Sequence, residues 1–231
     1  LDTACAMTRS VADAIVAHEV LAARTVTRSH APLSRYRLAL VGNLMQDDMD
    51  TTVARAFATA LGRLRAAGAT IVEIELPALN DLPALMAHGG FAGAESFALH
   101  RAAIARVGDR FDPRVVARIQ RGAAMSAADY IDLLHLRTSW IDRISRSLQA
   151  CDAVLSPTVP IVAPTIASVA PGAERDEVFF LDNSLLLRNT GIVNLFDGCA
   201  LSLPCHPSGD LPVGLMVWHG AMHDDVVLNV S

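Results

Sequence analysis

The chain has 231 residues, of which 52% are apolar, and a formal net charge of −5 at pH 7. This length and composition suffice for one large buried core. The acidic balance excludes the basic face that nucleic acid requires, so we expect no nucleic-acid partner. All 19 basic residues are arginine, which excludes a lysine Schiff base or lysine general base among these residues. No apolar run approaches the roughly 18 residues of a membrane span, so we expect no membrane partner.

Cysteine spacing predicts the redox compartment of the protein, and the two ends of the sequence predict whether it is a segment of a longer one. The four cysteines lack any C-x-x-C spacing, which predicts reduced, buried thiols in a cytoplasmic protein: Cys5, Cys151, Cys199 and Cys205. The sequence opens at Leu1 without a methionine and stops soon after the helix-start pattern HDDVVLNVS. We therefore expect it to be a segment of a longer polypeptide.

The first third of the chain predicts a helix followed by a β-α-β unit. Residues 8–23 predict a helix whose apolar face carries Val11, Ile15, His18, Val20 and Leu21. The run RLALVG (37–42) is typical of a strand buried on both faces. Residues 50–68 predict a helix capped by Asp50, and TIVEIELP (70–77) alternates like a strand. A crossover of this kind pairs its two strands in parallel.

The rest of the chain predicts a helical region, another strand and a hairpin. Residues 83–150 read as helices broken near Gly89, Asp112 and Gly122, with Ser126 and Asp129 capping the last one. The run CDAVLSPT (151–158) predicts a buried strand, and 178–195 are partly helical. The runs at 199–204 and 211–218 predict a hairpin joined by CHPSGDLP. Parallel and antiparallel pairs together indicate an α/β fold with a mixed sheet.

Three reactive-looking side chains lie in that hairpin. Cys205 and His206 are adjacent, and adjacent strand residues point to opposite faces, so they cannot form a nucleophile–base pair unless the backbone turns sharply. We expect a buried cysteine at the strand end and a solvent-facing histidine opening the loop. Ser202 lies in mid-strand without a G-x-S-x-G elbow, so we expect it to face the core or bond within the sheet.

No pattern in the chain predicts a metal site. His219 and His223 have i,i+4 spacing, but Gly220 interrupts it and no H-E-x-x-H glutamate is present. Asp224 is better suited to cap the helix that follows. The acidic run from Asp47 to Asp50 fits a solvated loop before a helix. We therefore expect neither a metal nor a cofactor.

Several stretches, read together, resemble the amidase signature family. LDTACAMTRSVADAI is similar to the family's L-D-x-x-G-P-x-A-R-S-V-x-D-A, and LGRLRAAGATIVEIELP to A-L-x-x-x-G-A-x-V-x-E-V-x-L-P. SAADYIDLLHLR resembles its Y-x-x-A-x-x-x-R helix, and CDAVLSPTVPIVAP its D-x-L-x-x-P-T-x-P strand and loop. The hairpin resembles N-x-x-G-x-P-A-L-S-x-P-x-G followed by G-x-P-V-G-L-Q.

The resemblance covers residues 1–231 but only about the C-terminal half of the family. It implies an α/β/α sandwich around a mixed sheet, of which this chain is the C-terminal portion of a single domain. Family members hydrolyse amides with a Ser–cis-Ser–Lys triad and no cofactor. The lysine and both serines lie upstream of the L-D-x-x-G-P landmark. The resemblance thus implies no catalytic residue in this segment, in agreement with its lack of lysine.

The chain departs from the family pattern at scaffold positions. Cys199 stands for the usual proline, His206 for a glycine and Met216 for a glutamine, while Cys5 and Ala6 replace Gly-Pro. These changes indicate a divergent subgroup without by themselves denying activity.

The resemblance implies one candidate residue for substrate binding, and three functions are compatible with the sequence. Arg118 aligns with a position where some members present an arginine to a substrate carboxylate; the alternative is a solvated surface arginine. The favoured function is an amidase acting on a small-molecule amide, with the N-terminal half and a second copy as expected protein partners. The alternatives are an A-type subunit of a tRNA-dependent amidotransferase and a non-enzymatic α/β binding module.

Overall fold

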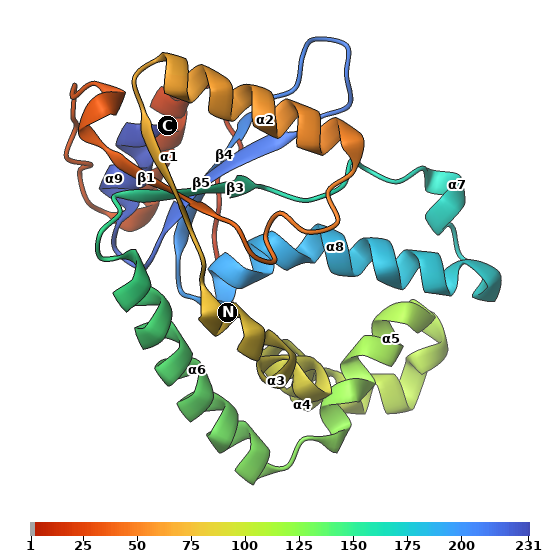
Figure 1. Cartoon of the computed structure of the whole chain (residues 1–231). Helices are drawn as coiled ribbons and strands as arrows, with labels where there is room; N and C mark the ends of the chain where they lie inside the picture. The colour runs from red at the N-terminus through yellow and green to blue at the C-terminus, as the bar shows by residue number, and fades with distance from the viewer. Residues whose placement is uncertain (1–2) are drawn as a thin grey trace. The chain divides into compact units, whose positions relative to one another are not determined.

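A computed structural model describes residues 3–231, and its centre is one mixed sheet with the strand order β2-β1-β3-β5-β4 (Figure 1). The strands are β1 (Arg37–Val41), β2 (Thr70–Ile74), β3 (Ala153–Pro157), β4 (Cys199–Pro204) and β5 (Gly214–His219). β1 pairs in parallel with β2 and β3, and β5 pairs antiparallel with β3 and β4. The predicted crossover and hairpin are confirmed, although β5 begins at Gly214 rather than at 211.

The helices follow the predicted breaks. They are α1 (Val11–Ala22), α2 (Thr51–Ala66), α3 (Leu82–Leu85), α4 (Gly90–Val107), α5 (Pro113–Gln120), α6 (Ala127–Leu148), α7 (Ile166–Val169), α8 (Asp176–Leu195) and α9 (Asp224–Val230). Asp50 caps α2 by accepting a hydrogen bond from the Val53 N–H at 2.7 Å. Ser126 and Asp129 form the predicted reciprocal cap of α6, with bonds of 2.9 and 3.1 Å.

Helices cover both faces of the sheet, which confirms the α/β/α arrangement. On one face, Phe57 and Leu61 of α2 and Val227 of α9 pack against a row of strand residues that includes Leu38 and Leu155. On the other face, Phe196 at the end of α8 meets Trp218 of β5 edge to face, with ring centroids 6.2 Å apart. β3 lies between these layers and is buried along its whole length.

The predicted apolar face of α1 is only partly correct. Ile15 is buried and forms a small cluster with Val26 and Leu228. Val20 and Leu21, expected on the same face, are 76% and 62% exposed. α1 is apolar around most of its circumference, so periodicity alone could not determine which side is buried.

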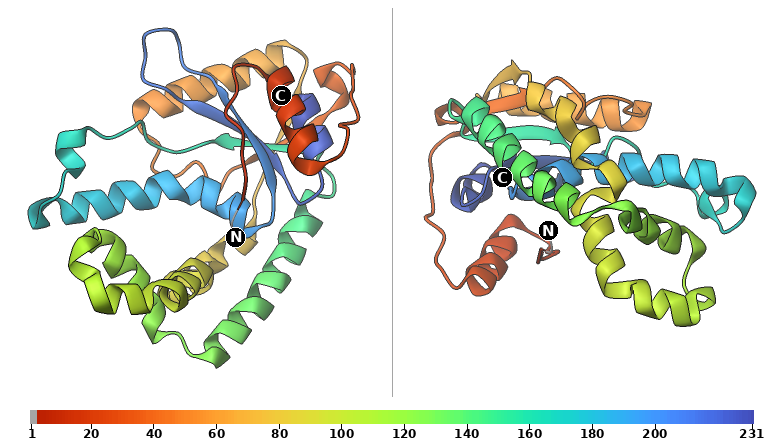
Figure 2. Two further views of the ribbon diagram at one scale, coloured as in Figure 1. Left: turned by 180° about the vertical axis from the view of Figure 1, so that it is seen from behind. Right: turned by 90° about the horizontal axis from the view of Figure 1, so that it is seen from below.

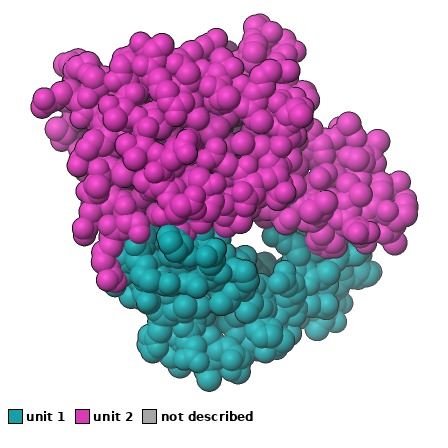
Figure 3. All heavy atoms as spheres, in the orientation of Figure 1, with its two compact units in different colours: residues 1, 77–144 teal, residues 2–76, 145–231 magenta. Residues whose placement is uncertain are grey.

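The chain divides into two compact units (Figure 3). Of the described residues, the larger comprises 3–76 and 145–231 and contains the five-stranded sheet. The smaller comprises residues 77–144 and contains α3, α4, α5 and most of α6. Within residues 3–231, every helix is too short or too polar to cross a bilayer.

Candidate functional site

Arg118 lies on the exposed side of α5 in the smaller unit. Pro113 opens this helix and Asp112 caps it, accepting from the backbone N–H groups of Arg114 and Val115 at 2.8 and 3.3 Å. The same helix buries Arg114, which is only 8% exposed. An exposed arginine on a capped helix can reach a carboxylate, but its role as a substrate contact stays a prediction.

A close backbone contact holds α5 against α4. A Cβ atom on Gly122, just after α5, would lie 2.1 Å from the carbonyl oxygen of Gly93 in α4. No side chain fits there, so glycine at 122 is what allows the two segments to touch. This contact determines where α5, and with it Arg118, lies within the smaller unit.

The tyrosine and arginine of the Y-x-x-A-x-x-x-R stretch have a structural role in that unit. Tyr130 meets Phe91 of α4 edge to face at 5.7 Å, and Arg137 places its guanidinium 5.8 Å from the centroid of the same ring. The Tyr130 hydroxyl donates to Glu95 at 3.0 Å. Burial and this carboxylate raise the pKa of Tyr130. These contacts pack α6 on α4.

The smaller unit also has a hollow of about 300 Å³ that sequence reasoning missed. Leu133 and Met125 contribute apolar walls, and His88, Asp129 and Asp132 contribute polar groups. His88 has a φ of 52°, in the left-handed region that few non-glycine residues adopt. Arg118 is not part of this lining, so the hollow and the predicted contact are separate features.

Cys205 and His206 do not form a catalytic pair. Burial raises the pKa of the Cys205 thiol, which packs against the core. His206 is half-buried, not solvent-facing as predicted, because its Nδ1 accepts from the Val213 N–H at 3.2 Å and so closes the hairpin loop. Both residues have structural roles.

Ser202 is exposed, so its hydroxyl does not face the core, and its partner lies just outside the sheet rather than in a strand. Its Oγ lies 2.6 Å from the hydroxyl of Thr158, just beyond β3. Gly214 passes beside both groups, and a Cβ there would lie 2.5 Å from each hydroxyl oxygen. The partner of Ser202 is thus another hydroxyl, which cannot act as its general base.

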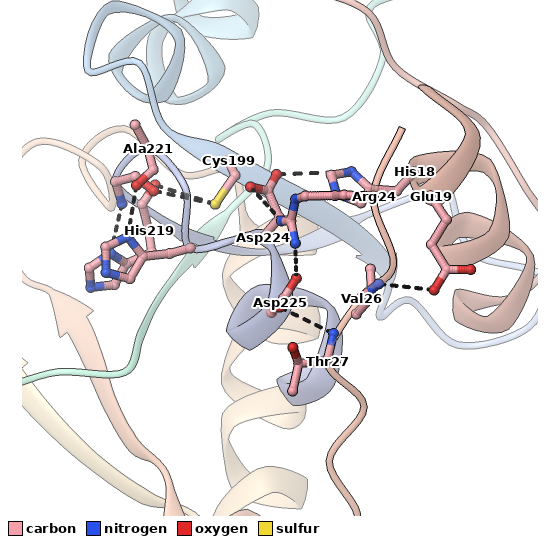
Figure 4. A network of polar contacts seen from close by, with 12 residues as sticks. His18, Glu19, Arg24, Val26, Thr27, Cys199, His219, Ala221, Asp224 and Asp225 are labelled. Carbon is pink, nitrogen blue, oxygen red and sulfur yellow. Dashed lines mark hydrogen bonds and ion pairs between the residues drawn. The ribbon is translucent and has the colours of Figure 1, made fainter. Parts of the chain in front are cut away.

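Residues near the start of the described chain and those of α9 form one polar network in the larger unit (Figure 4). Arg24 donates to Asp225 at 2.6 Å and to Asp224 at 3.4 Å, and the Thr27 N–H donates to Asp225 at 3.1 Å. Hydrogen bonding to Arg24 lowers the pKa of Asp225. The prediction that Asp224 caps α9 is wrong: the cap position belongs to His223, and Asp224 faces Arg24 and His18.

Cys199 and the neighbouring His219 are shielded from solvent. Burial, with a smaller contribution from Asp224, raises the pKa of Cys199 to about 12. His219 accepts from the Gly220 N–H at its Nδ1, 2.8 Å away, and burial lowers its pKa, so the ring is neutral. Its ring lies 3.9 Å from that of His223. Among residues 3–231 no group of three or more metal-ligating side chains comes together.

Asn189 is a buried polar residue that sequence reasoning missed. It lies in α8 with no exposed surface, and its Nδ2 donates to the Met45 and Pro157 carbonyls at 2.8 and 2.9 Å. Those carbonyls lie at or just beyond the ends of β1 and β3, where the direction of strand addition reverses. Open α/β sheets commonly bind ligands in the crevice at this point. Here the Asn189 amide joins two backbone carbonyls at these strand ends.

Comparison with known proteins identifies relatives across almost the whole chain. The family model described as Amidase matches residues 1–228. The 2-amino-5-chloromuconic acid deaminase of Comamonas testosteroni is 30% identical over 94% of this chain and 47% of its own length. The A-type subunit of the glutamyl-tRNA(Gln) amidotransferase of Halobacterium salinarum is 27% identical over 81% and 48%. A crystal structure of amidase superposes with a TM-score of 0.78 at 24% identity, covering 96% of this chain and 50% of that one.

The chain spans about half the length of the curated relatives that it matches. Their other halves therefore have no counterpart among these residues.

Proposed function

This chain belongs to the amidase family, and we propose that it is the C-terminal portion of a single amidase signature domain that hydrolyses a carboxylic amide to an acid and ammonia. The observation that carries this proposal is the family match over residues 1–228. The superposition on a solved amidase supports the corresponding fold.

In the proposed reaction, an activated serine attacks the amide carbonyl, backbone N–H groups hold the oxyanion, and water hydrolyses the acyl-enzyme. The nucleophile and its lysine would lie outside this chain. The low reactivity expected of the nucleophilic side chains in the hairpin supports a nucleophile outside this chain. Cys199 and Cys205 have raised pKa values, and Ser202 pairs with a hydroxyl rather than with a base.

We propose Arg118 as the contact for a carboxylate on the substrate. A guanidinium suits a carboxylate because it donates two parallel hydrogen bonds. The substrate named for the Comamonas testosteroni relative is itself an acid. In the assembled enzyme, Arg118→Ala should raise KM for acidic amides about tenfold and leave neutral amides unchanged, whereas Arg106→Ala should affect neither. Equal effects on both substrate classes would contradict this role.

Two other functions are alternatives to the amidase. An A-type amidotransferase chain is favoured by one specific observation, the match to the Halobacterium salinarum protein, and it would show itself by activity only with partner chains and a tRNA-linked substrate. A non-enzymatic α/β binding module is the second alternative, and it would show itself by binding a ligand without turnover. The family match over residues 1–228 favours the amidase over both alternatives.

The proposed partners are a small-molecule amide, the N-terminal half of the fold and, as a further state to test, a homodimer. The proposed compartment is the cytoplasm. All four cysteines are free thiols, as expected there, although Cys5 is exposed and the other three are half-buried rather than fully buried.

The decisive test measures ammonia release from a panel of acidic and neutral amides. The purified 231-residue chain should release none, and its complex with the N-terminal half should release ammonia from at least one of them. Turnover by the chain alone would contradict the placement of the catalytic residues, and turnover that requires a tRNA-linked substrate would favour the amidotransferase.

A further inference from the structure

The turn between β5 and α9 is held by two hydrogen bonds to one buried residue, Gly220. Its N–H donates to Nδ1 of His219 at 2.8 Å, and its carbonyl accepts from the Cys199 thiol at 3.4 Å (Figure 4). A Cβ atom on Gly220 would lie 3.2 Å from the Phe196 ring, so the turn is closely packed. Met222, two residues later, has a φ of 65°, in the left-handed region that is unfavourable for a non-glycine residue. The turn therefore depends on these side-chain contacts for its conformation.

The acceptor role of His219 requires a neutral ring. Because Nδ1 accepts from the Gly220 N–H, the ring proton lies on Nε2, which is buried and has no hydrogen-bond partner of normal geometry. A second proton can enter only at Nδ1, where it removes the acceptor of a buried N–H. Protonated His219 and the native turn are therefore incompatible.

His223 opposes the same protonation. Its ring lies 3.9 Å from the ring of His219, with an angle of 31° between the planes, and it occupies the cap position of α9. Its Nδ1 lies 2.9 Å from the Ala221 carbonyl oxygen, within the same turn. Burial lowers the pKa of His219 and the charge of His223 lowers it further, whereas the backbone at the end of α6 and the Asp152 carboxylate raise it. The folded state thus disfavours a proton that an unfolded histidine binds at about pH 6.5.

The other charged or titratable groups around the two histidines cannot replace the lost hydrogen bond. They come from α1, β1, β4, α9 and the segments that follow α1 and α6: His18, Arg24, Arg37, Cys151, Asp152, Cys199 and Asp224. Asp152 is already bonded to Arg37 by three hydrogen bonds of 2.7, 3.0 and 3.3 Å. Burial keeps both thiols protonated. A proton on His18 would strengthen its contact with Asp224, 4.0 Å away, so acid loosens the turn through His219 and His223.

We propose that the stacked pair of His219 and His223 is a pH switch that frees the start of α9 when His219 takes up a proton. α1 lies beside α9 (Figure 2), and the segment after α1 bonds to Asp225 of that helix. Freeing α9 therefore also loosens that segment. Because the open turn binds the proton more tightly than the closed one, stabilisation by the pair is complete above about pH 6.5 and is lost as the pH falls below that value. This response is separate from the proposed reaction.

Hydrogen–deuterium exchange with mass spectrometry tests the switch in the protein as its natural host produces it. Protection factors, which correct for the effect of pH on chemical exchange, should fall about tenfold for residues 220–231 between pH 7.5 and pH 5.5, because the open turn binds a proton at about pH 6.5. Peptides that cover β1 should keep their protection. Equal protection of residues 220–231 at the two pH values would overturn the proposal.

Two substitutions, made in the same host, separate the switch from a general effect of acid. His223→Asn removes the opposing charge at an exposed position and should reduce the loss of protection to less than about threefold. His219→Asn keeps a side-chain oxygen that can accept from Gly220 but cannot take up a proton, so its protection should not depend on pH. His30→Asn, at another exposed histidine, is the matched control and should behave like wild type. A loss as large as that of wild type in either variant of the pair would overturn the proposal, and His223→Asn decides alone if His219→Asn does not fold.

Discussion

The four thiols differ chiefly in how much solvent reaches them. Cys5 is exposed, whereas Cys199 and Cys205 pack against the core and have raised pKa values because burial disfavours the thiolate. The thiolate is the nucleophile, so exposure and pKa together predict reactivity. Sequence spacing alone could not rank these residues.

Alkylation of the native chain tests that ranking. With a pKa of about 12, only about one Cys199 thiol in ten thousand is ionised at pH 8. Iodoacetamide at pH 8 should label Cys5 and leave Cys199 unmodified by peptide mass spectrometry, and all four cysteines should react in guanidinium chloride. Labelling of native Cys199 as fast as Cys5 would contradict this ranking.

Asn189 should contribute more to stability than any other polar side chain of α8. Asn189→Ala leaves the Met45 and Pro157 carbonyls without their donor in a buried site. We expect a loss of about 3 kcal/mol in the free energy of unfolding, measured by urea denaturation. Thr190→Ala, one residue later on the same helix, is the control and should change it by less than about 0.5 kcal/mol. Equal losses of unfolding free energy in the two variants would mean that the hydrogen bonds of the Asn189 amide do not stabilise the fold.

The elements at the two ends of the described chain depend on each other. The segment after α1 bonds to α9 through Arg24 and Thr27, both of which donate to Asp225. Asn229 extends the contact by donating to the Thr27 carbonyl at 2.7 Å. These residues lie about two hundred positions apart, so local sequence rules gave no sign of the pairing.

Acid should weaken this contact in a defined pH range. The folded-state pKa of Asp225 is lowered, so its stabilisation is complete above the unfolded value of about 3.9 and is lost as the pH falls through the folded value. The difference in urea midpoint between wild type and Asp225→Asn should therefore be largest near pH 7 and shrink towards pH 3. Asp210→Asn, which removes an exposed pair with Arg55, should have little effect at either pH. If the difference in urea midpoint between wild type and Asp225→Asn did not change with pH, the Asp225 carboxylate would not be the stabilising group.

At the scale of the whole molecule, the single domain proposed for this chain contains two compact units. Each unit has one tryptophan: Trp140 in the smaller, donating to the Ala78 carbonyl at 2.7 Å, and Trp218 in the larger. α6 begins in the smaller unit and ends in the larger. Because one helix is common to both, we expect the units to unfold together.

Single-tryptophan variants can test this expectation. Trp218→Phe reports on the smaller unit and Trp140→Phe on the larger. In each variant the fluorescence midpoint in urea should coincide with the midpoint from far-UV circular dichroism. Separate midpoints in either variant would show that the units are independent domains.

The sequence by itself determined the order of the strands and of most helices, although it predicted 178–195 as only partly helical and gave no sign of α7. Buried strands such as 37–41, the capped helix after Asp50 and the hairpin at 199–219 follow from periodicity, caps and turn residues within a few positions. The family resemblance likewise rests on linear motifs. The tertiary structure alone decided that Val20 is exposed, that Ser202 bonds Thr158, and that Asn189 donates to the Met45 and Pro157 carbonyls. Each of these depends on which distant segment packs nearby, and local periodicity carries no information about that.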